Sequence, residues 1–89
     1  MTRDEVKAEI AKVFYKRYKQ DFNEIDENAP LSVILEIDER IDSLEIIEFL
    51  FDIEDQFALK NVDMPDPREA KIGDIVDSVH AEVMKKNAE

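Results

Sequence analysis

The chain lacks cysteine altogether and contains a single glycine and a single histidine. Without a thiol there is no disulfide, no thiolate metal site and no cysteine nucleophile. With Gly73 alone, neither a Gly-rich phosphate-binding loop nor an EF-hand turn is expected, since no Asp-rich segment contains the glycine that such a turn needs. His80 has no second histidine or cysteine to share a metal, and no serine, histidine and acid are spaced as a recognisable triad. We therefore expect a protein that is not an enzyme and holds no metal, with His80 at or near the surface.

Long apolar runs are missing as well. No apolar stretch approaches the length needed to span a membrane. The first five residues lack the hydrophobic stretch of a signal peptide, and they carry acids that transit peptides avoid. We expect a cytoplasmic protein without membrane insertion. At 89 residues the chain predicts one small domain, 1–89, and we expect it to be a monomer.

Positive charge is scarce outside the N-terminal fifth of the chain. The net charge is −11, with 12 Lys and Arg against 23 Asp and Glu. Residues 1–20 carry six basic and three acidic residues, whereas residues 21–58 carry one arginine and thirteen acids. Such an acidic surface repels phosphates, so nucleic-acid binding is disfavoured and partners with basic patches are favoured.

Three long helical segments can be predicted. Thr2 and Glu5 form a capping box for a helix over residues 3–19. Its basic end at Lys16, Arg17 and Lys19 suits the helix dipole, and we interpret these side chains as solvated. The other two helices are expected at 43–58 and 71–86. Apolar residues at helical spacing mark the first and last helices: Val6, Ile10, Val13, Phe14 and Tyr18, then Ile72, Ile75, Val76, Val79 and Val83.

A long connection, residues 20–41, separates the first two helices. Pro30 interrupts it and allows one helical turn over 30–35, after which Val33, Leu35 and Ile37 are expected to lie beneath the bundle. A second short helix is expected over 67–70, opened by Pro67. The predicted fold class is all-α: a small bundle of three main helices plus one short helix, with a long loop between helices one and two.

The helix over 43–58 begins with a distinctive sequence, Asp42-Ser43-Leu44-Glu45. Asp42 is a good N-cap, and Glu45 three residues later suggests an aspartate version of the capping box. Ser43 then falls at the first helical position, where free backbone N–H groups and the helix dipole favour an anion such as a phosphate. The alternative is that Asp42 caps an ordinary helix in which Ser43 is merely tolerated.

This helix has two apolar faces. With Leu44 set at zero on a helical wheel, Ile47 falls at about 300° and Phe51 at about 340°, opposite the wider core face at about 140–240°. The core face comprises Ile46, Phe49, Leu50, Ile53 and Phe57. Carboxylates flank the outward stripe of Leu44, Ile47 and Phe51: Glu45, Glu48, Asp52 and Asp55 on one side and Glu54 on the other. Such a stripe predicts a docking surface for a basic partner. Alternatively, the preceding segment, with Val33, Ile34, Leu35 and Ile37, folds over it.

Over nearly its whole length the chain resembles an acyl carrier protein. Asp42-Ser43-Leu44 is similar to the family's Asp-Ser-Leu signature at the start of its second helix, and Glu45 through Phe57 follow its alternation of acids and aliphatics. Met64-Pro65-Asp66 resembles the family's aliphatic-Pro-Asp step. Ile72-Gly73-Asp74-Ile75-Val76 resembles the Val-Gly-Asp-Leu-Val opening of its last helix.

The resemblance implies that Ser43 is the attachment point of 4′-phosphopantetheine, whose thiol carries acyl groups as thioesters. A phosphopantetheinyl transferase would add the group from coenzyme A, and Asp42 would cap the helix and help orient the donor. Acyl-transferring or condensing enzymes of fatty acid, polyketide or modified-lipid synthesis would be further partners. The resemblance assigns partner contacts to apolar positions Leu44, Ile47, Phe51 and Met64, and to acidic positions Glu45, Glu48, Glu54 and Asp55.

The chain also departs from the family pattern. Glu39-Arg40-Ile41 replaces the usual Leu-Gly before the signature, which places an arginine close to the expected phosphate. Phe49 and Phe51 are bulkier than the aliphatics common at these positions. We interpret these departures as marks of a specialised carrier. Two alternatives stay open: a peptidyl, aryl or D-alanyl carrier of the same fold, and an acidic helical adaptor without the prosthetic group.

Overall fold

The computed structural model describes residues 1–37, 39, 41–59, 66 and 69–88. Among these residues the chain forms three long helices, α1 (Arg3–Tyr18), α2 (Ser43–Gln56) and α3 (Ile72–Ala88), and no strand. Two short 3-10 helices, η1 (Phe22–Glu24) and η2 (Leu31–Glu36), lie between α1 and α2. The prediction of a small all-α bundle is confirmed. The predicted short helix at 67–70 falls partly outside the described residues.

The long helices begin and end close to the predicted positions. At the start of α1 the Thr2 hydroxyl accepts from the Glu5 amide and the Glu5 carboxylate accepts from the Thr2 amide, which confirms the capping box. Lys19, with φ 59°, ends this helix in the left-handed region. The second helix ends at Gln56, two residues earlier than predicted, and Ala58 follows it with a φ of 53°.

The core draws on every helix. Phe14 of α1 lies at its centre, with its ring centroid 5.3 Å from that of Phe22 and 5.6 Å from that of Phe49. All the apolar positions predicted for α3 are buried, as are Ile46, Phe49, Leu50 and Ile53 of α2. Phe57 is partly buried and packs against the core. The predicted inward faces of the helices are therefore confirmed.

The connection between α1 and α2 contributes different residues from those expected. Leu31 and Ile34 of η2 are fully buried, whereas Val33, Leu35 and Ile37 are partly buried at the edge of the core. The 3-10 geometry explains the difference, because residues three apart in such a helix lie on one face. Leu31 and Ile34, one turn apart, therefore occupy the inward positions predicted from the sequence for Val33, Leu35 and Ile37.

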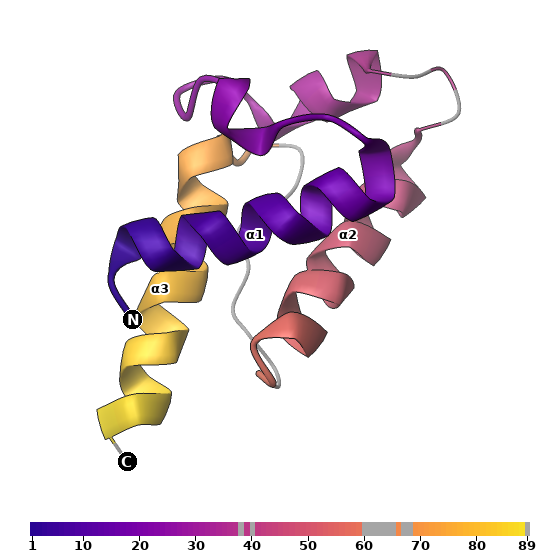
Figure 1. The fold of residues 1–89 in the computed structure, drawn as a ribbon. Helices are drawn as coiled ribbons and strands as arrows, with labels where there is room; N and C mark the ends of the chain where they lie inside the picture. The colour runs from indigo at the N-terminus through magenta and orange to yellow at the C-terminus, as the bar shows by residue number, and fades with distance from the viewer. Residues whose placement is uncertain (38, 40, 60–65, 67–68, 89) are drawn as a thin grey trace.

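The helices cross one another. Figure 1 shows α1 running across both α2 and α3, with the η1–η2 segment along one end of the bundle. The long connection left room for α1 and α2 to run nearly parallel or antiparallel, but α1 instead packs against both other helices at an angle. None of the helices in the described part combines the length and apolarity needed to cross a bilayer.

Backbone hydrogen bonds join the connection to the start of α3. The Gly73 amide donates to the Glu27 carbonyl at 2.9 Å, and the Leu31 amide donates to the Ala70 carbonyl at 2.8 Å. A Cβ at Gly73 would lie 3.0 Å from Glu27 Oε1 and 3.3 Å from its carbonyl oxygen. The close approach of these two segments therefore explains why position 73 is occupied by glycine, the only one in the chain.

The Glu27 carboxylate is the centre of an ion-pair cluster at this junction. It binds the Arg3 guanidinium and the Lys7 ammonium group, the latter at 3.0 Å. Arg3 Nε also donates to Asp77 Oδ1 at 2.6 Å, so that the cluster joins α1, the connection and α3. The hydrogen bond from Arg3, followed by that from Lys7, lowers the pKa of Glu27 to about 2.

Candidate docking face on α2

The start of α2 has the predicted N-cap. The Asp42 carboxylate accepts from the Glu45 amide at 3.0 Å, and the Asp42 carbonyl accepts from the Ile46 amide. The Glu45 carboxylate does not turn back to complete a capping box, because it is bound by Arg17 of α1. Ser43 is the first residue of the helix and is exposed.

The first turn of α2 suits an anion attached to the Ser43 side chain. Asp42 occupies the Glu45 amide, but the amides of Ser43 and Leu44 donate to no acceptor among the described residues. Amides at the positive end of a helix dipole stabilise phosphate groups. The residues present at this position therefore fit a phosphate ester.

The outward stripe of α2 is exposed, as predicted. Leu44 is 62 % exposed, Ile47 39 % and Phe51 59 %, whereas their neighbours Ile46 and Phe49 are almost completely buried. The alternative in which the preceding segment covers this stripe is wrong. The apolar side chains of that segment are directed into the core. Three large apolar side chains thus lie side by side on the surface of a small acidic protein.

The predicted acidic rim is also present, but its members are not equivalent. Glu48 and Asp55 are exposed and Glu54 is half-buried. Glu54 and Asp55 have no ion-pair partner in the part of the chain that the structure describes. Met64, the remaining predicted contact, lies outside the described residues, and so does Arg40.

Arg17 of α1 contacts the acids of α2, an arrangement that the sequence pattern did not indicate. Its Nε and Nη2 donate to Asp52 Oδ2 at 3.0 and 2.7 Å, and its Nη1 donates to Glu45 Oε2 and lies 3.6 Å from Glu48 Oε2. The prediction of a solvated side chain at this position is wrong, because Arg17 is only 21 % exposed. The thirteen acids in residues 21–58 are the sequence signal for this contact, because so many carboxylates favour ion pairs with a neighbouring cation.

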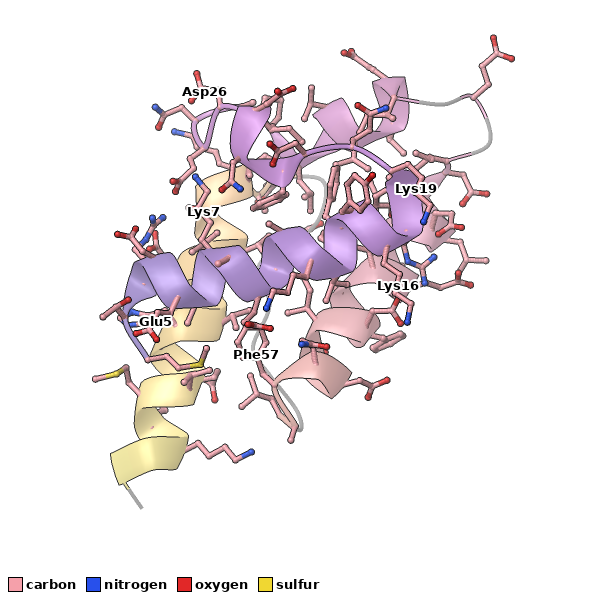
Figure 2. The ribbon with its side chains drawn as sticks, in the orientation of Figure 1. Glu5, Lys7, Lys16, Lys19, Asp26 and Phe57 are labelled. Carbon is pink, nitrogen blue, oxygen red and sulfur yellow. The ribbon has the colours of Figure 1, made fainter. Side chains whose placement is uncertain are left out.

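The neighbouring lysines behave as predicted. Lys16 and Lys19 are exposed, and Figure 2 shows both at the end of α1 that lies near the start of α2. Lys19 approaches the Tyr15 ring, with its Nζ 5.7 Å from the centroid. Neither lysine pairs with an acid among the described residues, which distinguishes them from Arg17.

The contact between α1 and α2 perturbs two titrating groups. Partial burial lowers the pKa of Arg17, but the hydrogen bond to Asp52 and the charges of Asp52 and Glu45 outweigh it, so the net effect is to raise this pKa. Partial burial, assisted by the nearby charge of Glu45, raises the pKa of Tyr18 to about 12. At neutral pH the contact therefore holds a charged guanidinium beside a neutral phenol.

A surface hollow of about 460 Å³ lies on this α1-facing flank of α2. Its walls include Arg17, Tyr18, Ile41 and Glu45, and Ser43 is not among its lining residues. On a helix Ser43 and Glu45 are separated by about 200°, so the serine is directed away from this hollow. The hollow therefore belongs to the contact with α1 rather than to the serine.

The described residues contain no cluster of histidine, cysteine or carboxylate side chains that would hold a metal ion. His80 lies half-buried on α3, in agreement with the prediction for it.

Comparison with known proteins finds no matching family model, no matching curated protein and no matching solved structure.

Proposed function

We propose that this protein is a carrier in which Ser43 bears 4′-phosphopantetheine and presents tethered acyl groups to partner enzymes. The observation that carries the proposal is the exposed serine at the first position of α2, adjacent to an exposed apolar stripe. The resemblance to acyl carrier proteins in Asp42-Ser43-Leu44 and the residues after it supports the same function. The departures before Ser43 favour a specialised member.

Each residue of the face has a distinct task in this function. The Ser43 hydroxyl is the acceptor for the phosphopantetheinyl group, and the amides of Ser43 and Leu44 would stabilise the charge of its phosphate. When bound, the group supplies the thiol that holds an acyl chain as a thioester, which this cysteine-free chain lacks. Asp42 fixes the start of the helix through its bond to the Glu45 amide.

The partners are enzymes that carry a basic patch beside an apolar pocket. The exposed Leu44, Ile47 and Phe51 supply apolar contact area, and the acids beside them attract cations and raise the rate of encounter. The first partner is a phosphopantetheinyl transferase. The others are acyl-transferring or condensing enzymes of fatty acid, polyketide or modified-lipid synthesis.

The test is coexpression with a broad-specificity phosphopantetheinyl transferase, followed by intact mass measurement. We expect a mass increase of one phosphopantetheinyl group, which is lost in Ser43→Ala. Ser78→Ala is a matched control, because Ser78 also follows an aspartate but lies within α3. A chain that stays unmodified with several transferases, or a modification that survives Ser43→Ala, would refute the proposal.

A further inference from the structure

We propose that Arg17 determines which acids of α2 a basic partner can use. It binds Glu45 and Asp52 within the protein, lies 3.6 Å from Glu48, and leaves Glu54 and Asp55 as the charged contacts. This inference rests on the proposed function and makes it more specific: the face that docks enzymes is narrower than the acidic rim, and a residue of another helix defines its edge.

The contacts of Arg17 support this division. The Asp52 carboxylate accepts two hydrogen bonds from the guanidinium, and Glu45 accepts one. Glu48 lies at the boundary, because its carboxylate is 3.6 Å from Arg17 Nη1 and is still 51 % exposed. The acids of α2 thus differ in how far they are already paired within the protein, and Asp52 is paired most completely.

The position of Ser43 points to the flank away from α1. On the helical wheel Ser43 lies at about 260°, close to Glu54 at about 280° and Ile47 at about 300°. Glu45 lies at about 100° and Asp52 at about 80°, on the opposite side of the helix. An enzyme that reaches the serine hydroxyl therefore approaches from the side away from α1. It meets Glu54 first and then the apolar stripe. Beyond the stripe it meets Asp55, at about 20°, before it meets Asp52 and Glu45, the acids that Arg17 binds.

Charge explains why Arg17 acts as a specificity determinant. A partner cation placed against Asp52 would also lie beside the Arg17 guanidinium, and like charges in one contact oppose binding. The same cation placed against Asp55 meets no intramolecular competitor among the described residues. Partners whose basic residues face the α1 side are consequently disfavoured.

The test measures loading of the purified protein by a phosphopantetheinyl transferase in matched isosteric variants. In the native background we expect Asp55→Asn to raise KM about two- to fivefold, the range of one exposed ion pair, and Asp52→Asn to change it less than about 1.5-fold. In an Arg17→Gln background Asp52→Asn should raise KM by about the same factor as Asp55→Asn, because Asp52 is then available to the enzyme. The value of kcat should stay constant, and thermal unfolding verifies that each variant is folded.

The outcomes separate the two proposals. Suppose that, in the native background, Asp52→Asn impairs loading as strongly as Asp55→Asn does. This result overturns the role of Arg17 and leaves the carrier function intact. The role of Arg17 is likewise overturned if Arg17→Gln does not increase the effect of Asp52→Asn. If no variant, including the native chain, is loaded at Ser43, the carrier function fails and the inference fails with it.

Discussion

Neutralising Glu27 should destabilise the protein at neutral pH and have little effect in acid. Glu27→Gln keeps the size and shape of the side chain, so it leaves the close packing against Gly73 intact, but it removes the charge that Arg3 and Lys7 bind. The pKa of Glu27 is lowered from 4.5 to about 2. This shift sets an upper limit of ~3 kcal/mol on the free energy by which the charged carboxylate stabilises the folded state. Because the Glu27 and Arg3 side chains are 30 % and 35 % exposed, solvent screening reduces the expected loss to about 1 kcal/mol.

The pH dependence has a definite sign. The pKa of Glu27 is lowered in the folded state, so its contribution is complete above about pH 4.5 and is lost as the pH falls toward 2. Urea unfolding followed by circular dichroism, at pH 7 and at steps down to the acid limit of the fold, measures the difference between the native chain and the variant. For a domain of this size the expected loss at pH 7 corresponds to a melting temperature lower by roughly 4–8 °C.

Glu24→Gln is the control for this measurement, since Glu24 lies on η1 of the same connection, is exposed and has no ion-pair partner in the described part of the chain. It should leave stability within about 0.5 kcal/mol of the native value. Two results would refute the reasoning: a Glu27→Gln variant as stable as the native chain at pH 7, or a loss of stability that is the same at every pH. The second would indicate a packing defect rather than a lost charge.

Further predictions concern α2. Asp42→Ala removes the side chain that accepts from the Glu45 amide and should cost about 1 kcal/mol in the free energy of unfolding. Urea titration measures this loss, and an unchanged midpoint would show that the cap does not contribute to stability. Phe49→Ala removes a fully buried ring from the aromatic cluster and should cost about 3–5 kcal/mol in the free energy of unfolding. Phe51→Ala, a change of the same size on the exposed face, should alter stability by less than about 0.5 kcal/mol while raising the KM for loading by a transferase. Equal thermal melts for the two phenylalanine variants would contradict the assignment of the two faces.

Helix positions and faces were the most predictable features of this chain. The capping box at Thr2, the cap at Asp42 and the 3.6-residue spacing of apolar residues are local signals, so they place α1, α2 and α3 within about two residues. The same periodicity correctly distinguishes buried Phe49 from exposed Phe51, although the two side chains are identical.

Contacts between distant segments were not predictable in this way. Whether Leu31 or Val33 faces the core depends on 3-10 geometry in a connection whose sequence carries no strong period. The role of Arg17 depends on α1 crossing α2, which the spacing of apolar residues within each helix does not specify. A cation beside thirteen acids indicates that an ion pair will form, but the crossing determines that Asp52 and Glu45 are the partners.

The crossing of α1 over both other helices has a consequence for biosynthesis. Arg3 pairs with Asp77, 74 positions later, and the apolar side chains of α1 are covered by residues of α2 and α3. Because α1 is synthesised before α2 and α3, its buried side is not fully covered until α3 has been made. Until then a nascent chain exposes Val6, Ile10 and Phe14, three apolar side chains that are fully buried in the folded protein.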